Sequence, residues 1–216
     1  MNDWLQQFQE KLLKEFRETI QFIGLQGSRA RNEANDNSDI DVVVIFDQLT
    51  FEKFKRYEAI ANTMPERHLL CGFVGGIDDL HAWDKADLFT FMYDTIPLYG
   101  DISDLKTMIT AEDVKRFIRS TAGNVYHMTL HNYLHSKSTD MIPGLYKTAR
   151  FAIQGKVFIG QNQFIAQLNE LPSYINGQDT VMIERLIALK NNSPIDLNDD
   201  TEILVAWAKE TLQAFK

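Results

Sequence analysis

Two kinds of hydrophobic spacing divide the chain into halves. In the first half, residues 5–16 carry apolar side chains every three or four positions, which predicts an amphipathic helix. Two short apolar segments follow, at residues 20–25 and 39–46. The second of them is rich in β-branched side chains, as a buried strand is. A helix followed by two strands is therefore expected at the start of the chain.

The remaining elements follow from similar signals. A second helix is predicted from Thr50 to about Met64, where Pro65 would end it. Strands are predicted at residues 69–74 and 88–93, with a short helix at 77–83 between them. After Gly100 the alternating pattern disappears and helical spacing dominates to the end of the chain.

These elements predict an α+β fold with two domains. Residues 1–101 would form a mixed β-sheet with flanking helices, and residues 102–216 an all-helical bundle of about five helices. With 216 residues and 44% hydrophobic content, the chain can bury one good core or two modest ones.

Charge and composition narrow the classes of function. A formal net charge of −8 makes broad binding to nucleic acid unfavourable. No apolar run is long enough to span a membrane, and no charged leader precedes an apolar stretch at the N-terminus. Cys71 is the single cysteine, so no internal disulfide can form; we interpret it as a small buried hydrophobe. We therefore expect a cytoplasmic protein.

The segment that carries chemistry joins a glycine turn to a pair of aspartates. Gly27-Ser28 follows a predicted strand and can open a helix, whose free N–H groups suit phosphate. Asp39 and Asp41 are two residues apart in a strand, so their side chains share one face. Mg²⁺ commonly binds one or two carboxylates together with phosphate oxygens. The alternative is that both aspartates are strand-entry residues beside a solvated loop.

The residues from Leu25 to Val44 resemble the signature of the polymerase β-like nucleotidyltransferases: Gly-Ser, a variable stretch, then Asp-hydrophobic-Asp-hydrophobic. The sequence Gly-Ser-Arg-Ala-Arg at residues 27–31 is similar to the corresponding sequence in the minimal and aminoglycoside-modifying (kanamycin-type) branches of that superfamily. Asn32 departs from the glycine of many relatives, but asparagine also tolerates left-handed backbone. The helical second half is similar to theirs in kind and order only.

That resemblance implies a Mg²⁺-dependent enzyme that transfers a nucleoside monophosphate onto a hydroxyl group. AMP, from ATP, is the nucleoside monophosphate we expect. The acceptor would be a small molecule, with an aminoglycoside-like antibiotic among the candidates. Modification of a protein or RNA, as in toxin–antitoxin pairs, and a decayed nucleotide-binding module are the alternatives. The oligomeric state is left open, with a homodimer among the options.

The resemblance also implies a third carboxylate on a neighbouring strand, as a metal ligand or a general base. Asp87, at the start of the predicted strand 88–93, is the preferred candidate, and Asp94 is the competitor. Seven positions along a strand would place these two on opposite faces, so both cannot serve. The remaining alternative is that neither is the third acid.

Two further groups of residues are candidates for ligand contacts. Arg29 and Arg31 follow the glycine turn, and one of them, with Arg29 as the candidate, is expected near the phosphates or the loop carboxylates; a solvated surface role is the alternative. Lys147, Arg150 and Gln154 share one face of a predicted helix. The resemblance implies that Lys147 and Arg150 contact the phosphates, and an ordinary solvated face is the alternative. The other group is a histidine stripe, His127, His131 and His135. Its alternatives are a surface or structural role, a transition-metal site and a contact with the acceptor.

Overall fold

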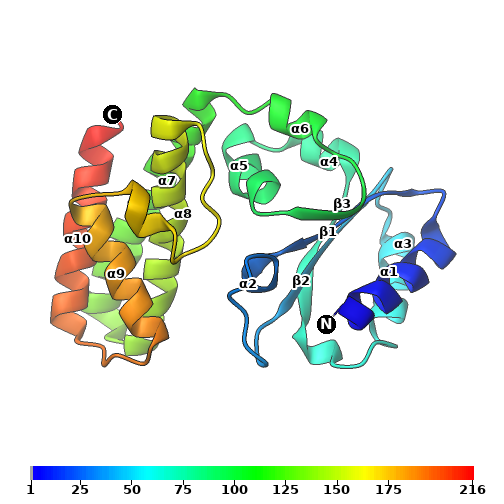
Figure 1. The fold of residues 1–216 in the computed structure, drawn as a ribbon, viewed down its shortest axis with the longest axis horizontal. Helices are drawn as coiled ribbons and strands as arrows, with labels where there is room; N and C mark the ends of the chain where they lie inside the picture. Colours follow the sequence, from blue (N-terminus) through cyan, green and yellow to red (C-terminus); the bar gives the residue numbers. More distant parts are fainter. Residues whose placement is uncertain (1) are drawn as a thin grey trace. The chain divides into compact units, whose positions relative to one another are not determined.

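A computed structural model describes residues 2–216 and divides the chain into two compact units. The first unit ends at Met108 and the second spans Ile109–Lys216. Figure 1 shows strands and helices mixed in the first unit and helices throughout the second. Among the described residues, no helix is both long and apolar enough to cross a membrane.

The first unit is built around a four-stranded mixed sheet in the order β3-β2-β1-β4. Strand β1 is antiparallel to both β2 and β4, and β3 is parallel to β2. Its elements are α1 (Asn2–Phe16), β1 (Ile20–Gln26), α2 (Gly27–Ala30), β2 (Ile40–Phe46), α3 (Phe51–Ala61), a 3-10 turn (Arg67–Leu69), β3 (Leu70–Gly76), α4 (Ile77–Ala82), α5 (Lys85–Tyr93), β4 (Ile96–Gly100) and α6 (Asp104–Thr107).

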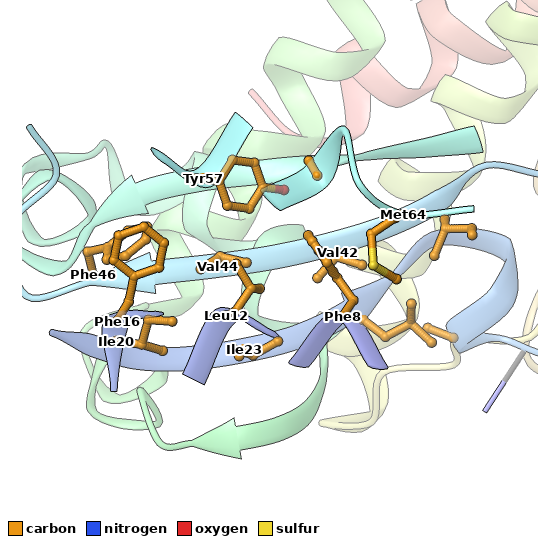
Figure 2. Close-up of a cluster of buried hydrophobic side chains, with 14 residues drawn as sticks. Phe8, Leu12, Phe16, Ile20, Ile23, Val42, Val44, Phe46, Tyr57 and Met64 are labelled. Carbon is orange, nitrogen blue, oxygen red and sulfur yellow. The ribbon is translucent and has the colours of Figure 1, made fainter. Parts of the chain in front are cut away.

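Helices α1 and α3 pack together on one face of the sheet and enclose its main core (Figure 1). Alternate residues of β2 point into this core, because side chains on a strand alternate between its two faces. Figure 2 shows the side chains that meet there: Phe8, Leu12, Phe16, Ile20, Ile23, Val42, Val44, Phe46, Tyr57 and Met64. Buried aromatic and branched side chains from four elements therefore hold β1 and β2 in place.

The strand predicted at residues 88–93 is wrong, because this segment is helix α5 (Lys85–Tyr93). Asp84 caps the helix by accepting a hydrogen bond from the backbone N–H of Ala86 at 2.8 Å. Leu88, Phe89 and Met92 are then buried on one side of it, which is a helical spacing. The fourth strand lies later, at Ile96–Gly100.

The prediction that Cys71 is a buried hydrophobe is also wrong. Cys71 is exposed on β3, an edge strand with β2 as its one neighbour in the sheet. Burial along β3 increases toward its end: Gly75 and Gly76 are buried, whereas Cys71 and Gly72 near the start of the strand are exposed.

The second unit contains four long helices, counted over Ile109–Lys216. They are α7 (Ala111–His131), α8 (Ile142–Gln161), α9 (Gln178–Lys190) and α10 (Leu197–Ala214), with a π-helical turn (Asn132–Ser136) and 3-10 turns (Thr139–Met141, Leu171–Tyr174) between them. Over residues 102–216, the range for which about five helices were predicted, the short helix α6 is the fifth. The division into units falls later than residue 101 because α6 packs against α5 and so belongs to the sheet unit.

A buried carboxylate ties three helices of this unit together. Asp200 of α10 is fully buried and accepts a hydrogen bond from the Tyr146 hydroxyl of α8 at 2.9 Å. Both oxygens of Asp200 also accept bonds from the Arg185 guanidinium of α9, at 2.7 and 2.8 Å. Burial beside this carboxylate raises the pKa of Tyr146. Both oxygens of the buried Asp200 carboxylate thus have hydrogen-bond donors, and its negative charge is paired with the Arg185 guanidinium, as a buried charge requires.

Helix α7 begins with a capping box that gives a test of its stability. Thr110 and Asp113 exchange hydrogen bonds there, and the Thr110 hydroxyl, which donates to the Asp113 carboxylate at 2.6 Å, lowers the pKa of Asp113 below its usual value. A lowered pKa means that this stabilisation is complete above the unfolded-state pKa and is lost as pH falls through the folded-state value.

We therefore expect Thr110→Ala to lower the free energy of unfolding of the helical unit by about 1 kcal/mol at pH 7. The loss should shrink below about pH 4, where Asp113 is protonated in the unfolded chain. Urea denaturation, with hydrogen exchange at the first turn of α7, measures both effects. Equal stability of variant and parent at pH 7 would show that the capping box contributes nothing.

Candidate functional site

One end of each of the four strands lies at the same side of the sheet, which we call the sheet edge. Strand β1 finishes there, and β2, β3 and β4 all start there, since Gln26 pairs with Asp41, Asp41 with Cys71, and Leu25 with Ile96. The Gly27-Ser28 turn leaves β1 at this edge and opens the short helix α2, as the sequence predicted. The topology therefore brings the glycine turn to the start of the aspartate strand.

Gly27 lies directly against the carboxylate of Asp41. Its φ is +73°, a conformation that favours glycine. A β-carbon placed on Gly27 would overlap Asp41 Oδ2 and lie 2.9 Å from Asp41 Cγ. Because no side chain fits between them, the Asp41 carboxylate reaches the backbone of the turn. Asp41 is half-buried at this point, and Asp39, one residue before β2, is exposed.

Arg29 holds the loop that delivers the aspartates. Its guanidinium donates to the backbone carbonyl of Ser38, at 2.6 Å from Nη2 and 3.2 Å from Nε, and to that of Asp39 at 2.9 Å. The side chain thus joins α2 to the residue that begins the Asp-x-Asp pair. The predicted contact of Arg29 with the nucleotide stays a prediction, and the observed bonds give this side chain a positioning role.

The backbone after α2 turns at Asn32, whose φ is +58°. This is the left-handed conformation that asparagine adopts more readily than most other residues with a side chain. The departure from glycine at this position is therefore compatible with the turn, as expected from the sequence.

Asp94, rather than Asp87, lies at the edge where the strands meet. Asp94 follows the C-terminal end of α5, two residues before β4, and its carboxylate is paired with the guanidinium of Arg31. Gln26, the last residue of β1, donates to the hydroxyl of the adjacent Thr95 at 2.6 Å. Both sides of the glycine turn are thereby tied to the segment that carries Asp94.

Asp87 is placed elsewhere because its segment is helical. It is an exposed residue in the first turn of α5, seven residues before Asp94. That separation corresponds to about 10 Å along a helix. The reason for preferring Asp87, a position at a strand start, therefore fails. A preformed set of three metal ligands is not seen either: within residues 2–216, no three histidine, cysteine or acidic side chains are grouped to hold a metal ion.

The oxygens at the sheet edge suit Mg²⁺ even so. This ion prefers oxygen ligands and is usually bound through one or two carboxylates plus substrate phosphates. Asp39 and Asp41 are two carboxylates that could hold this ion, and the missing side chain at Gly27 leaves Asp41 Oδ2 against the backbone of the turn.

The two basic residues predicted on α8 differ in environment. Lys147 is exposed, whereas Arg150 is 3% exposed and donates to the backbone carbonyl of Ala166. Gln154 is buried too and donates to the carbonyl of Ile165 at 2.7 Å. The three side chains lie at one-face spacing within α8, as predicted, but the segment that carries Ile165 and Ala166 covers Arg150 and Gln154. The expected contact of Lys147 and Arg150 with the phosphates stays a prediction.

The histidine stripe is present as predicted. Ring centroids lie 5.9 Å apart for His127 and His131 and 4.6 Å apart for His131 and His135, and all three side chains are exposed. The stripe lies on the second unit, at the end of α7 and in the π-helical turn that follows.

Two comparisons with known proteins found matches. Residues 5–92 match the family model described as nucleotidyltransferase domain. A matching solved structure is that of spectinomycin adenyltransferase AAD(9) from Enterococcus faecialis with ATP and spectinomycin, at 14% identity and a TM-score of 0.61, covering 99% of each chain. No curated protein matches. The α+β fold, with its mixed sheet and helical second part, is confirmed. The family model agrees with the predicted nucleotidyltransferase resemblance over residues 5–92.

The close approach at the glycine turn makes Gly27→Ala a sharp test of the site. The added methyl group would overlap the Asp41 carboxylate and adopt an unfavourable φ, so we expect a stability loss of about 1–3 kcal/mol. Nucleotide transfer should fall by about 100-fold, because displacement of a reacting group by 1 Å has effects of that order.

The matched control is Gly160→Ala, since a β-carbon there meets no atom within 4 Å. Thermal unfolding and initial transfer rates measure the two effects. If Gly27→Ala transferred at the parental rate, the contact between the turn and Asp41 would be irrelevant to function.

Proposed function

We propose that this chain, whose residues 5–92 form a nucleotidyltransferase domain, transfers AMP from ATP to a hydroxyl group of a small molecule and releases pyrophosphate. The observation that carries the proposal is the position of the Asp41 carboxylate against the Gly27 turn. A turn that can bind phosphate and a carboxylate that can bind a cation are what a triphosphate site needs.

The proposed roles follow from where each residue lies. The backbone and hydroxyl of Gly27-Ser28 would bind the triphosphate, and Asp39 and Asp41 would hold Mg²⁺. When bound, Mg²⁺ supplies positive charge that stabilises the negative charge on the phosphate oxygens. Arg29 keeps both aspartates at the turn by fixing the carbonyls of Ser38 and Asp39.

In the transfer, the acceptor hydroxyl oxygen forms a bond to the α-phosphorus of ATP. The bond from that phosphorus to the oxygen bridging the α- and β-phosphates breaks, and pyrophosphate leaves with the electron pair. The hydroxyl proton must pass to a base. We assign this base to Asp94, because it lies at the same sheet edge and Arg31 holds its carboxylate there.

A small cationic acceptor is the class that the chain's charge favours. The net charge of −8 attracts cations and repels nucleic acid. The fold is shared with an adenyltransferase whose structure contains ATP and spectinomycin, so spectinomycin and aminoglycosides are the first acceptors to test. A cytoplasmic location, where ATP is available, is part of the proposal.

The cation role of Asp41 is tested by Asp41→Asn. With α-³²P-labelled ATP, Mg²⁺ and spectinomycin or an aminoglycoside, the parent should label the small molecule, and Asp41→Asn should lower the rate by at least about 100-fold. Asp36→Asn is the matched control, since Asp36 is an exposed aspartate in the loop before the pair and should leave the rate unchanged.

The same assay decides the class of acceptor. Label on a protein or RNA instead would replace the small-molecule acceptor, and no transfer to any acceptor would contradict the enzyme proposal. Parental activity in Asp41→Asn would remove the metal role.

The third carboxylate is decided by comparing Asp94→Asn with Asp87→Asn. We expect Asp94→Asn to lower kcat by about 100- to 10,000-fold, as loss of a general base does, and to leave ATP binding within about threefold. Asp87→Asn should leave both values unchanged.

Because Asp94 is paired with Arg31, circular dichroism and the ATP dissociation constant must first show that the variant is folded. A folded Asp94→Asn protein with parental kcat would contradict the assignment. A large loss in Asp87→Asn would restore the original preference.

A further inference from the structure

The histidine stripe at the end of α7 is given no role in the proposed transfer reaction, and two of its rings lie close together. His131 is the last residue of α7, and His135 lies in the π-helical turn that follows. Both side chains are exposed. We propose that His131 and His135 together bind a divalent transition-metal ion of the Zn²⁺, Cu²⁺ or Ni²⁺ class.

The spacing of the rings supports this pair in particular. A histidine nitrogen lies about 2.0–2.1 Å from Zn²⁺, so two imidazole centroids on one ion lie roughly 4.5–5.2 Å apart for ligand angles of about 90–110°. The His131 and His135 centroids are 4.6 Å apart, inside that range. The His127 and His131 centroids are 5.9 Å apart, outside it. His127 is therefore not a ligand of the proposed site.

The backbone that carries His135 is fixed before any ion binds. The side chain of Asn132 is buried, donates to the carbonyl of Ser138 at 2.9 Å and accepts from its N–H at 3.0 Å. The N–H of Lys137 closes the turn by donating to the carbonyl of Asn132 at 2.7 Å. A site on a fixed backbone loses less conformational entropy on binding than a site on a mobile loop.

Chemistry and position both favour a cation here. Neutral imidazole binds Zn²⁺, Cu²⁺ and Ni²⁺, whereas Mg²⁺ prefers oxygen ligands. The C-terminal end of a helix carries partial negative charge, which favours a positive ion. A two-histidine site leaves the remaining coordination positions to water. Its ligands would thus differ in kind from the carboxylates of the proposed Mg²⁺ site.

Zinc titration of the full chain tests the proposal. Isothermal calorimetry in a buffer that does not bind metal should show one Zn²⁺ per chain and no comparable binding of Mg²⁺. His131→Ala and His135→Ala should each weaken Zn²⁺ binding by at least about tenfold. His127→Ala and His68→Ala, a histidine of the first unit, should leave it within about threefold.

Hydrogen exchange provides a second readout and checks that the variants fold. Zn²⁺ should slow exchange at Lys137, whose N–H closes the turn, in the parent and in His68→Ala but not in His135→Ala. The proposal is overturned if the parent binds no Zn²⁺, if His131→Ala or His135→Ala binds it as the parent does, or if His127→Ala or His68→Ala abolishes binding. Each of these outcomes is independent of transferase activity.

Discussion

The contact between Gly27 and the Asp41 carboxylate depends on the pairing of two strands. Strands β1 and β2 run antiparallel with Gln26 opposite Asp41, so the residue after Gln26 lies beside the carboxylate. A side chain at that position would overlap it, and the backbone there is left-handed. The core that α1 and α3 form on these strands holds this register. The packing of the core therefore affects the candidate site through the backbone of Gly27, which lies beside the Asp41 carboxylate.

Electrostatics explain why two arginines follow the turn so closely. Carboxylates gathered at one sheet edge repel each other, and like charge raises the cost of keeping them ionised. Arg31 offsets this by pairing with Asp94, and it is only 5% exposed, where charge pairing is stronger than in water. Arg29 acts differently, because its bonds go to backbone carbonyls and so fix position. Arg31 thus neutralises the charge of Asp94, while Arg29 fixes the position of the backbone at Ser38 and Asp39.

The local sequence pattern predicted an element correctly where hydrophobic spacing and residue type indicate the same structure. It failed where they fit both a strand and a helix. Five of residues 40–46 are β-branched and six of the seven are buried, so the strand could be recognised without the structure. Residues 88–93 mix aromatic and apolar side chains that fit either a strand or a helix, and the cap at Asp84 decides for the helix. The pair of Asp94 with Arg31 joins residues 63 positions apart, which no local pattern encodes. The burial of Arg150 and Gln154 could not be predicted for a similar reason, since it depends on bonds to Ala166 and Ile165, which follow the end of α8.

The central claim, that the sheet edge beside Gly27 and Asp41 binds a cation together with a triphosphate, is tested most directly by replacing Mg²⁺ with paramagnetic Mn²⁺. With Mn²⁺ and a non-hydrolysable ATP analogue, amide NMR signals broaden near the ion. The account predicts that broadening is strongest at residues 27–29 and 39–41 and requires the nucleotide. Strongest broadening elsewhere in the chain, or none that depends on the nucleotide, would contradict it.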